Sequence, residues 1–273
     1  MLDPYVTATG RAIRERVFLD LEKNPDSIYC HNALCGETVI PPHKHDRGQL
    51  VYTEGGRVYI TANDKIWYLP SRHYIWIPAG VEHSMKISTP SVQLWTIYFP
   101  DWEDEPDFFK RIGIYPVNNM LLEEIYFTKN WVGHITRENK SRYFFVSGIK
   151  AILPEINDYS LPFDLPVPKD ERLSKVVGYM QNNLNEHITI TNMAKQHGMS
   201  ESTLARLFKK DLKMSFISYL GTLRILRSIE LLAAGKLNIK EICYEVGYES
   251  VPTFSNIFKK SVGVRPTTYL KVC

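Results

Sequence analysis

The carboxyl-terminal third of the chain contains one unit twice, and this repeat restricts the possible folds more than any other feature of the sequence. Up to a shared glycine the matching residues lie 49 positions apart, as Gly198 and Gly247 do. Beyond the glycine they lie 50 positions apart, as Phe208-Lys209-Lys210 and Phe258-Lys259-Lys260 do. The region therefore has to build the same substructure twice, with one extra residue in the turn of the second copy.

Capping residues and the glycine divide each copy into two short helices. Thr189 can cap the first helix of one copy, and Asn238 with Glu241 three residues later has the spacing of a capping box. The glycine allows a left-handed backbone conformation that costs other residues about 1 kcal/mol or more. Between the copies a longer helix is expected from Phe216 to Ala234. The sequence thus predicts an all-α domain of two helix-turn-helix units joined by a long helix.

The second helix of each unit has an apolar inner face and a polar, basic outer face. Such a face suits the major groove of double-stranded DNA, where Arg can bridge guanine and Asn can bridge adenine. An ordinary helical repeat whose lysines only face water is the alternative. The candidate DNA-binding residues are Glu201, Ser202, Thr203, Arg206, Lys209, Lys210, Val251, Pro252, Ser255, Asn256, Lys259 and Lys260.

The charge is divided unevenly along the chain. Residues 1–169 hold 18 Lys and Arg against 21 Asp and Glu, a net charge of −3, whereas residues 170–273 hold 15 against 9, a net charge of +6. A basic carboxyl-terminal domain favours a polyanionic partner. No apolar run of about 20 residues or secretory signal occurs, so we expect a cytoplasmic protein without a membrane segment. The four cysteines form no C-x-x-C pair and are expected to be reduced.

The repeat resembles the DNA-binding domain of the AraC/XylS family of bacterial transcription regulators. The resemblance rests on Ala194-x3-Gly198-x-Ser200-x3-Leu204-x-Arg206-x-Phe208-Lys209, on Arg224-Ile225-x2-Ser228-x2-Leu231-Leu232, on Ile239-x2-Ile242-Cys243-x2-Val246-Gly247-Tyr248, and on Phe254-Ser255-x2-Phe258-Lys259-Lys260-x2-Gly263-x2-Pro266-x2-Tyr269. It implies that both second helices enter successive major grooves on one DNA face. The chain departs from the family's pattern at Ser228 and Cys243, where alanine is usual, at Lys213, where glycine is usual, and at Asn256, where a basic residue is frequent.

A proline-rich segment separates this region from a different kind of sequence. Residues 157–169 contain three prolines within seven residues and are the expected linker. Between residues 38 and 99, short β-branched and aromatic runs alternate with turn-forming residues, a pattern typical of a β-sandwich or barrel. Residues 105–156 have a helical pattern. We therefore expect a β-barrel domain with following helices over residues 1–156 and the helix-turn-helix domain over residues 170–273.

Three histidines in the expected barrel have the spacing of a possible metal site. His43, His45 and Gln49 alternate along one stretch, and His83 follows Pro78-Ala79-Gly80. The spacing resembles the two cupin motifs, H-x-H-x3-E and P-x-G-x2-H, and implies a cupin-like barrel. Gln49 replaces the usual carboxylate and is a poorer ligand for hard divalent ions. Two readings stay open, a divalent metal ion on these four residues or histidines at the barrel mouth without a cofactor.

The barrel also holds many aromatic residues, which could fill its core or line a small-molecule pocket. Aromatic faces suit sugar rings, so a sugar is a candidate effector. The candidate ligand-binding residues are His43, His45, Gln49, His83, Tyr52 and Trp95.

Two functions from different classes follow. The favoured one is a transcription regulator, not an enzyme, whose amino-terminal domain senses a small molecule and forms a homodimer; RNA polymerase is a further candidate partner. The competing one is a metal-dependent cupin oxygenase or isomerase with an accessory helical domain. The sequence offers no paired carboxylates, nucleophile-and-base set or phosphate-binding glycine loop elsewhere.

Overall fold

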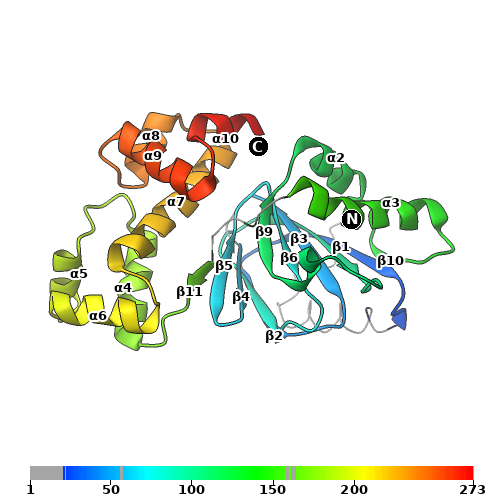
Figure 1. The fold of residues 1–273 in the computed structure, drawn as a ribbon, viewed down its shortest axis with the longest axis horizontal. Helices are drawn as coiled ribbons and strands as arrows, with labels where there is room; N and C mark the ends of the chain where they lie inside the picture. Colours follow the sequence, from blue (N-terminus) through cyan, green and yellow to red (C-terminus); the bar gives the residue numbers. More distant parts are fainter. Residues whose placement is uncertain (1–20, 22, 56–57, 158–159, 161–163, 273) are drawn as a thin grey trace. The chain divides into compact units, whose positions relative to one another are not determined.

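The computed structural model describes residues 21, 23–55, 58–157, 160 and 164–272 (Figure 1). The chain divides into two compact units, one formed by residues 1–63 and 67–161 and the other by residues 162–272 with 64–66. The first is rich in strands and the second consists mainly of helices. This agrees with the predicted fold class, a sheet-rich domain followed by a helical domain.

The described strands form two sheets. The six-stranded sheet has the order β10-β1-β8-β3-β6-β9, and the five-stranded sheet has the order β11-β5-β4-β7-β2. The strands of the first sheet are β1 (Ile28–Cys35), β3 (Gly48–Glu54), β6 (His73–Ile77), β8 (Val92–Phe99), β9 (Gly113–Pro116) and β10 (Gly133–Ile135). Those of the second are β2 (Thr38–His43), β4 (Val58–Ala62), β5 (Lys65–Leu69), β7 (His83–Ile87) and β11 (Asp164–Pro166).

Two helices cover one face of the six-stranded sheet. Helices α2 (Asn119–Phe127) and α3 (Lys140–Ile156) lie together beside it in Figure 1, and a short helix η1 (Asp107–Lys110) precedes them. Their buried residues share one core with alternate residues of the sheet: Leu50, Tyr52, Tyr74, Trp76, Trp95, Ile97, Leu121, Ile125, Val146 and Ile149. Side chains on both faces of β3 and β8 are buried, and for this reason the sequences of these strands contain continuous apolar runs.

Several strands were not predicted from the sequence. The turn Asn63-Asp64 joins β4 and β5 with φ of 53° and 59°, as the turn residues there indicated. In contrast, β1 begins before residue 38, and β9 and β10 interrupt the region that was expected to be only helical. The expected linker also includes β11. Strands β9, β10 and β11 have only three or four residues each, and β1 is buried on both faces, so its sequence does not alternate in polarity.

The carboxyl-terminal unit contains the predicted repeat. Its helices are α4 (Glu171–Asn182), α5 (Ile190–Gln196), α6 (Glu201–Asp211), α7 (Phe216–Ala234), α8 (Ile239–Glu245), α9 (Val251–Val262) and α10 (Pro266–Val272). Helix α7 has the predicted bounds and ends at Gly235 in the left-handed conformation. Thr189 caps α5, and Asn238 and Glu241 form the predicted capping box of α8. Helix α10 was not predicted.

The two glycine turns differ in how tightly they are packed. Gly198 and Gly247 both have positive φ, 66° and 81°. A Cβ atom on Gly198 would meet nothing within 4 Å, whereas one on Gly247 would lie 2.2 Å from the carbonyl oxygen of Leu184. Glycine at 198 is thus required for its backbone conformation alone, and glycine at 247 also for the close approach of another segment.

Candidate nucleic-acid interface and histidine cluster

The first candidate DNA-reading face lies on α6. Leu204 and Phe208 are buried beneath it, and Ser200 caps the helix by accepting a hydrogen bond of 3.2 Å from the backbone N–H of Thr203. The predicted outer residues Glu201, Ser202, Arg206, Lys209 and Lys210 are exposed, and Thr203 is half-buried. The amphipathic spacing therefore directs these side chains away from the core.

The second candidate face lies on α9 and repeats this arrangement. Phe254 and Phe258 are buried, and Ser250 caps the helix as Ser200 caps α6. Among the predicted residues, Pro252, Asn256, Lys259 and Lys260 are exposed, and Val251 and Ser255 are half-buried.

Arg265 is a cation on the second face that the sequence did not identify. This exposed residue lies between α9 and α10, and its Nη1 donates a hydrogen bond of 3.4 Å to Oγ of Ser255. It stands in a loop outside the repeated helix, so the helical spacing could not place it there. Its guanidinium adds a positive charge beside α9.

The departures from the family's pattern are accommodated locally. Ser228 is buried on α7 and donates a hydrogen bond of 2.7 Å to the carbonyl oxygen of Ile225. Cys243 is buried on α8, with Sγ 3.4 Å from the carbonyl oxygen of Tyr248. Both small polar groups therefore fill packing positions without leaving a polar atom unpaired.

The three histidines of the cupin-like motif come together in the amino-terminal unit. His43 at the end of β2 pairs with His83 at the start of β7, and an irregularity in β2 between Ile40 and His43 sets this register. The ring centroids of His43 and His83 are 4.2 Å apart, and those of His45 and His83 are 5.3 Å apart. One ring nitrogen from each of the three lies within 4.8 Å of the others. We call these three residues the histidine cluster.

The backbone fixes the orientation of each ring in the histidine cluster. Nδ1 of His43 lies 2.8 Å from the carbonyl oxygen of Pro41, and Nδ1 of His83 lies 2.9 Å from that of Val81. Nδ1 of His45 lies 2.9 Å from the carbonyl oxygen of Arg47. Because a carbonyl can only accept, each Nδ1 carries the proton and each Nε2 points away from the backbone.

Burial keeps two of these rings neutral. His83 is 2% exposed, and burial, with the nearby His43, lowers its pKa to about 3. His45 is 8% exposed, and burial lowers its pKa below the usual value despite its hydrogen bond with Gln49. A neutral imidazole with a protonated Nδ1 presents the lone pair of Nε2.

Only part of the predicted ligand set gathers at the histidine cluster. Gln49 on β3 is buried, with Oε1 3.1 Å from Nε2 of His45 and Nε2 3.3 Å from the hydroxyl of Tyr98. Tyr52 and Trp95 face each other across β3 and β8 and belong to the core under α2 and α3. Tyr52 is three positions from Gln49 on the same strand, so the two side chains point to opposite faces. The structure therefore does not bring Tyr52 and Trp95 to the histidines.

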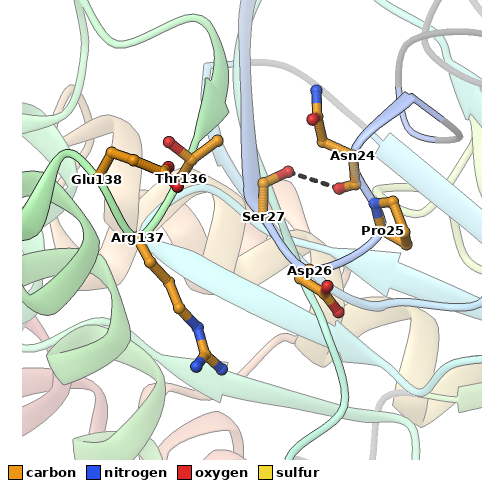
Figure 2. Close-up of a pocket in the computed structure, with 7 residues that line it drawn as sticks. All are labelled: Asn24, Pro25, Asp26, Ser27, Thr136, Arg137 and Glu138. Carbon is orange, nitrogen blue, oxygen red and sulfur yellow. Dashed lines mark hydrogen bonds between the residues drawn. The ribbon is translucent and has the colours of Figure 1, made fainter.

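A separate pocket opens where the segment before β1 meets the segment after β10. Its volume is about 450 Å³, and Figure 2 shows its lining residues: Asn24, Pro25, Asp26, Ser27, Thr136, Arg137 and Glu138. The hydroxyl of Ser27 donates to the carbonyl oxygen of Asn24 at 2.8 Å and lies 2.7 Å from Nδ1 of His134. Arg47 binds the carbonyl oxygens of Ser27, Leu21 and Asn24, which holds this wall in place. The sequence had assigned no role to these residues.

Comparison with protein families gives two matches. Residues 27–105 match the AraC-like ligand binding domain, which contains the histidine cluster and Gln49, and residues 193–271 match a helix-turn-helix domain, which contains both candidate DNA-reading faces. No helix in the described part of the chain combines the length and the apolar character needed to cross a membrane.

Individual relatives extend over both parts of the chain. The HTH-type transcriptional regulator NimR of Escherichia coli is 25% identical over 243 residues, 89% of this chain and 86% of NimR. The HTH-type transcriptional activator RhaR of Mannheimia succiniciproducens is 26% identical, over 84% of this chain and 86% of its own. The lactose operon transcription activator of Staphylococcus xylosus is 25% identical, over 69% and 70%.

These relatives are named as regulators and activators, so the competing enzyme hypothesis is set aside. The matched domains stand in the same order as the sheet-rich and helical units, and both repeats of the helical unit lie within or next to the matched helix-turn-helix region. The chain belongs to the AraC family of helix-turn-helix transcription regulators, with an AraC-like ligand binding domain before its DNA-binding domain.

Proposed function

We propose that residues 170–273 bind double-stranded DNA sequence-specifically through α6 and α9, and that a small molecule bound by residues 1–156 controls this binding. The observation that carries the DNA-binding part is the equivalence of the two outer faces. Each lies on a helix that a serine caps and that buried residues anchor, Leu204 and Phe208 in α6 and Phe254 and Phe258 in α9. Two such faces in one compact helical unit suit two adjacent segments of major groove.

The test is the salt dependence of DNA binding by the full chain. Lys209, Lys210, Lys259 and Lys260 are exposed and would displace condensed counterions from phosphates, so the affinity should fall steeply as salt rises. Replacing Lys209 or Lys259 with alanine should make the log-log slope shallower by about 1. Lys175→Ala on α4 is the matched control, because this lysine is exposed outside both faces. A slope near zero for the wild-type chain contradicts the proposal.

The small-molecule part rests on the match to the ligand binding domain over residues 27–105. The name of the Staphylococcus relative ties that protein to a lactose operon, which supports a sugar as the first class to test. Control of DNA binding requires the effector to bind one arrangement of the helix-turn-helix units better than another. Mono- and disaccharides should therefore change the thermal midpoint of tryptophan fluorescence and, in the same concentration range, the affinity for DNA.

We also propose that the chain is a homodimer through α2 and α3. Phe127 at the end of α2 and Phe144 in α3 are 65% and 68% exposed, and Met120 and Val132 nearby are exposed as well. Apolar side chains gathered on two neighbouring helices indicate a protein contact, and a twofold contact between copies is the commonest kind. Phe127→Asp/Phe144→Asp should then sediment as a monomer at concentrations where the wild type is a dimer. A wild-type monomer at tens of micromolar contradicts this.

A further inference from the structure

The turn of the second repeat packs against a loop that leads into the first repeat. The turn consists of residues 246–250 between α8 and α9, and the loop consists of residues 183–189 between α4 and α5. We propose that this contact, which Arg224 of α7 closes, fixes α6 relative to α9 and thereby sets the spacing of the two DNA segments that the chain reads. The consequence for DNA spacing rests on the proposed function, whereas the fixed orientation of the two helices does not.

The two glycine turns show that the helix-turn-helix motif itself does not require this contact. Gly198 is exposed, and a Cβ atom there would meet nothing within 4 Å. A Cβ atom on Gly247 would collide with the carbonyl oxygen of Leu184 in the loop and would lie 2.6 Å from Nη2 of Arg224. Because the first copy forms the same turn without a close neighbour, the packing at Gly247 serves the connection between the copies.

The extra residue of the second copy lies in this turn. Between the glycine and the capping serine the first copy has only Met199, whereas the second has Tyr248 and Glu249. Tyr248 is buried, and the centre of its ring lies 5.3 Å from the guanidinium carbon of Arg224. Glu249 is exposed, and its carboxylate lies 3.9 Å from Nδ1 of His187 in the loop. The insertion therefore provides two side chains that both contact residues outside their own repeat.

Arg224 bridges the loop and the second DNA-reading helix. Its Nη2 donates a hydrogen bond of 3.4 Å to the carbonyl oxygen of Glu186, and its guanidinium faces the ring of Tyr248 in a cation–π contact. The ring of Tyr248 lies 5.6 Å from that of Phe254, which anchors α9 in the core. No described group accepts the N–H of the buried Nε of Arg224, and an apolar residue would avoid leaving such a donor unpaired.

The loop is itself attached to α4 and to the first turn. The hydroxyl of Tyr179 on α4 donates a hydrogen bond of 2.6 Å to the carboxylate of Glu186, and Nδ2 of Asn183 donates one of 2.8 Å to the carbonyl oxygen of Tyr179. The ring of Tyr179 lies 6.2 Å from that of His197, the C-cap of α5. The repeats are thus connected at two places, through α7 and through the loop. A second connection prevents one repeat from rotating against the other about the axis of α7.

A fixed orientation of α6 and α9 makes the spacing of the DNA site important. One additional base pair between the two half-sites moves the second half-site by about 3.4 Å and rotates it by about 35° around the DNA axis. A rigid pair of helices cannot follow this change and loses the contacts of one half-site. The wild-type chain should therefore bind a site with one base pair added or removed at least about tenfold more weakly than its preferred site.

The experiment measures the affinity of the full chain for the selected site and for sites one base pair shorter and longer. In Arg224→Met and in Gly247→Ala the spacing penalty should fall below about threefold, while the base preference within each half-site stays unchanged, because neither residue lies on α6 or α9. Arg224→Lys keeps the charge and should restore part of the penalty. Gly198→Ala is the matched control, because it has the same backbone strain without a neighbour, and it should keep the full penalty.

A measurement without DNA separates this inference from the proposed function. Spin labels at Lys210→Cys and Lys260→Cys occupy equivalent exposed positions on α6 and α9, and Cys273→Ser leaves only cysteines that are buried. Electron–electron resonance should give one narrow distance distribution in the otherwise wild-type chain and a broader one with Arg224→Met, at equal helix content by circular dichroism.

Three results overturn the inference. They are a broad distance distribution in the chain that retains Arg224, equal affinity of the wild-type chain for all three spacings, and a folded Arg224→Met chain that keeps both the narrow distribution and the full spacing penalty. A wild-type chain that binds no double-stranded DNA contradicts the proposed function instead, and the distance distributions then decide on the fixed orientation alone.

Discussion

Lys213 and Gly263 occupy equivalent positions after the second helices of the two repeats, and both have a left-handed backbone. Their φ angles are 55° and 87°. Glycine adopts the left-handed conformation without strain, whereas for a residue with a Cβ atom this conformation costs about 1 to 2 kcal/mol. The fold therefore imposes the same helix ending on both copies, although only one copy has glycine there.

This pair predicts a stabilising substitution. Lys213→Gly should raise the free energy of unfolding of the helical unit by about 0.5 kcal/mol, because the relief of strain exceeds the extra freedom that glycine has in the unfolded chain. Gly263→Ala should lower it by about 1 kcal/mol. Urea unfolding followed by far-ultraviolet circular dichroism measures both. All five tryptophans lie between residues 67 and 131, so tryptophan fluorescence is the control for the other unit. A less stable Lys213→Gly chain contradicts the strain argument.

A buried ion pair connects α3 with the segment after β8. The side chain of Lys150 is fully buried, contacts the carboxylate of Glu105, and donates a hydrogen bond of 3.0 Å to the carbonyl oxygen of Pro100. Its ammonium also lies 4.3 Å from the ring centre of Trp102. Burial lowers the pKa of Lys150, and the carboxylate of Glu105 opposes this effect.

Removing the carboxylate should therefore destabilise the amino-terminal unit strongly. In Glu105→Gln the amide can still accept the N–H of Trp102, but the buried ammonium loses its counter-charge, at a cost of about 3 kcal/mol or more. Asp107→Asn is the matched control, because Asp107 pairs with Lys110 on the exposed surface, where solvent screens the pair, and its loss should change stability little. Tryptophan fluorescence during urea unfolding reports both. Equal effects of the two variants would show that Lys150 does not depend on Glu105.

His73 predicts how stability depends on pH. This residue is fully buried on β6, and burial lowers its pKa to about 4. Below about pH 6.5 the His73 imidazole is protonated in the unfolded chain but stays neutral in the folded chain. The free energy of unfolding therefore falls as pH falls from 6.5 towards 4. His73→Asn should reduce the loss between pH 7.5 and pH 5 by on the order of 2 kcal/mol. Unfolding curves of both chains at the two pH values test this. An unchanged difference would assign the loss to other groups, such as His45 and His83.

The helical unit could be predicted in detail because its signals are local. The N-caps Thr189 and Asn238 and the C-cap Gly235 each act on residues within one helical turn. The repeat also contains the same helix-turn-helix pattern twice. Strands β1, β9 and β10 were missed because their stability comes from partners far along the chain. Tyr29 on β1, for example, pairs with Tyr98. The alternation of polar and apolar residues does not identify a strand when both of its faces are buried.

The same distinction applies to the two candidate sites. The spacing of His43, His45 and Gln49 identified residues that the structure brings together with His83, because neighbouring positions on β2 and the following loop converge. Tyr52 and Trp95 could not be placed from composition, since one residue of register decides which face a side chain occupies. Arg265 lies in the loop after α9 and donates a hydrogen bond to Ser255. Helical periodicity does not extend into a loop, so the spacing of residues could not place it.

Arg206 and Asn256 should read bases, whereas the neighbouring lysines should only hold the phosphates. Both residues are exposed at equivalent positions, two residues after the buried Leu204 and Phe254. Arg can form two hydrogen bonds with guanine O6 and N7, and Asn can do so with adenine N6 and N7. Arg206→Ala should therefore cost about 1 to 3 kcal/mol on the preferred site and relax the preference at one base pair. Asn256→Ala should do the same about 10 base pairs away.

Selection from a library of randomised sites at fixed salt separates the two roles. Lys209→Ala and Lys259→Ala are the controls, because a phosphate contact carries no sequence information and its loss should weaken all sites alike. Arg206→Ala should change the recovered sequence at one position and leave the other half of the site intact, since α6 and α9 belong to separate repeats. If Arg206→Ala lowered every affinity equally, its guanidinium would be a backbone contact, and specificity would have to come from α9 or from the shape of the DNA.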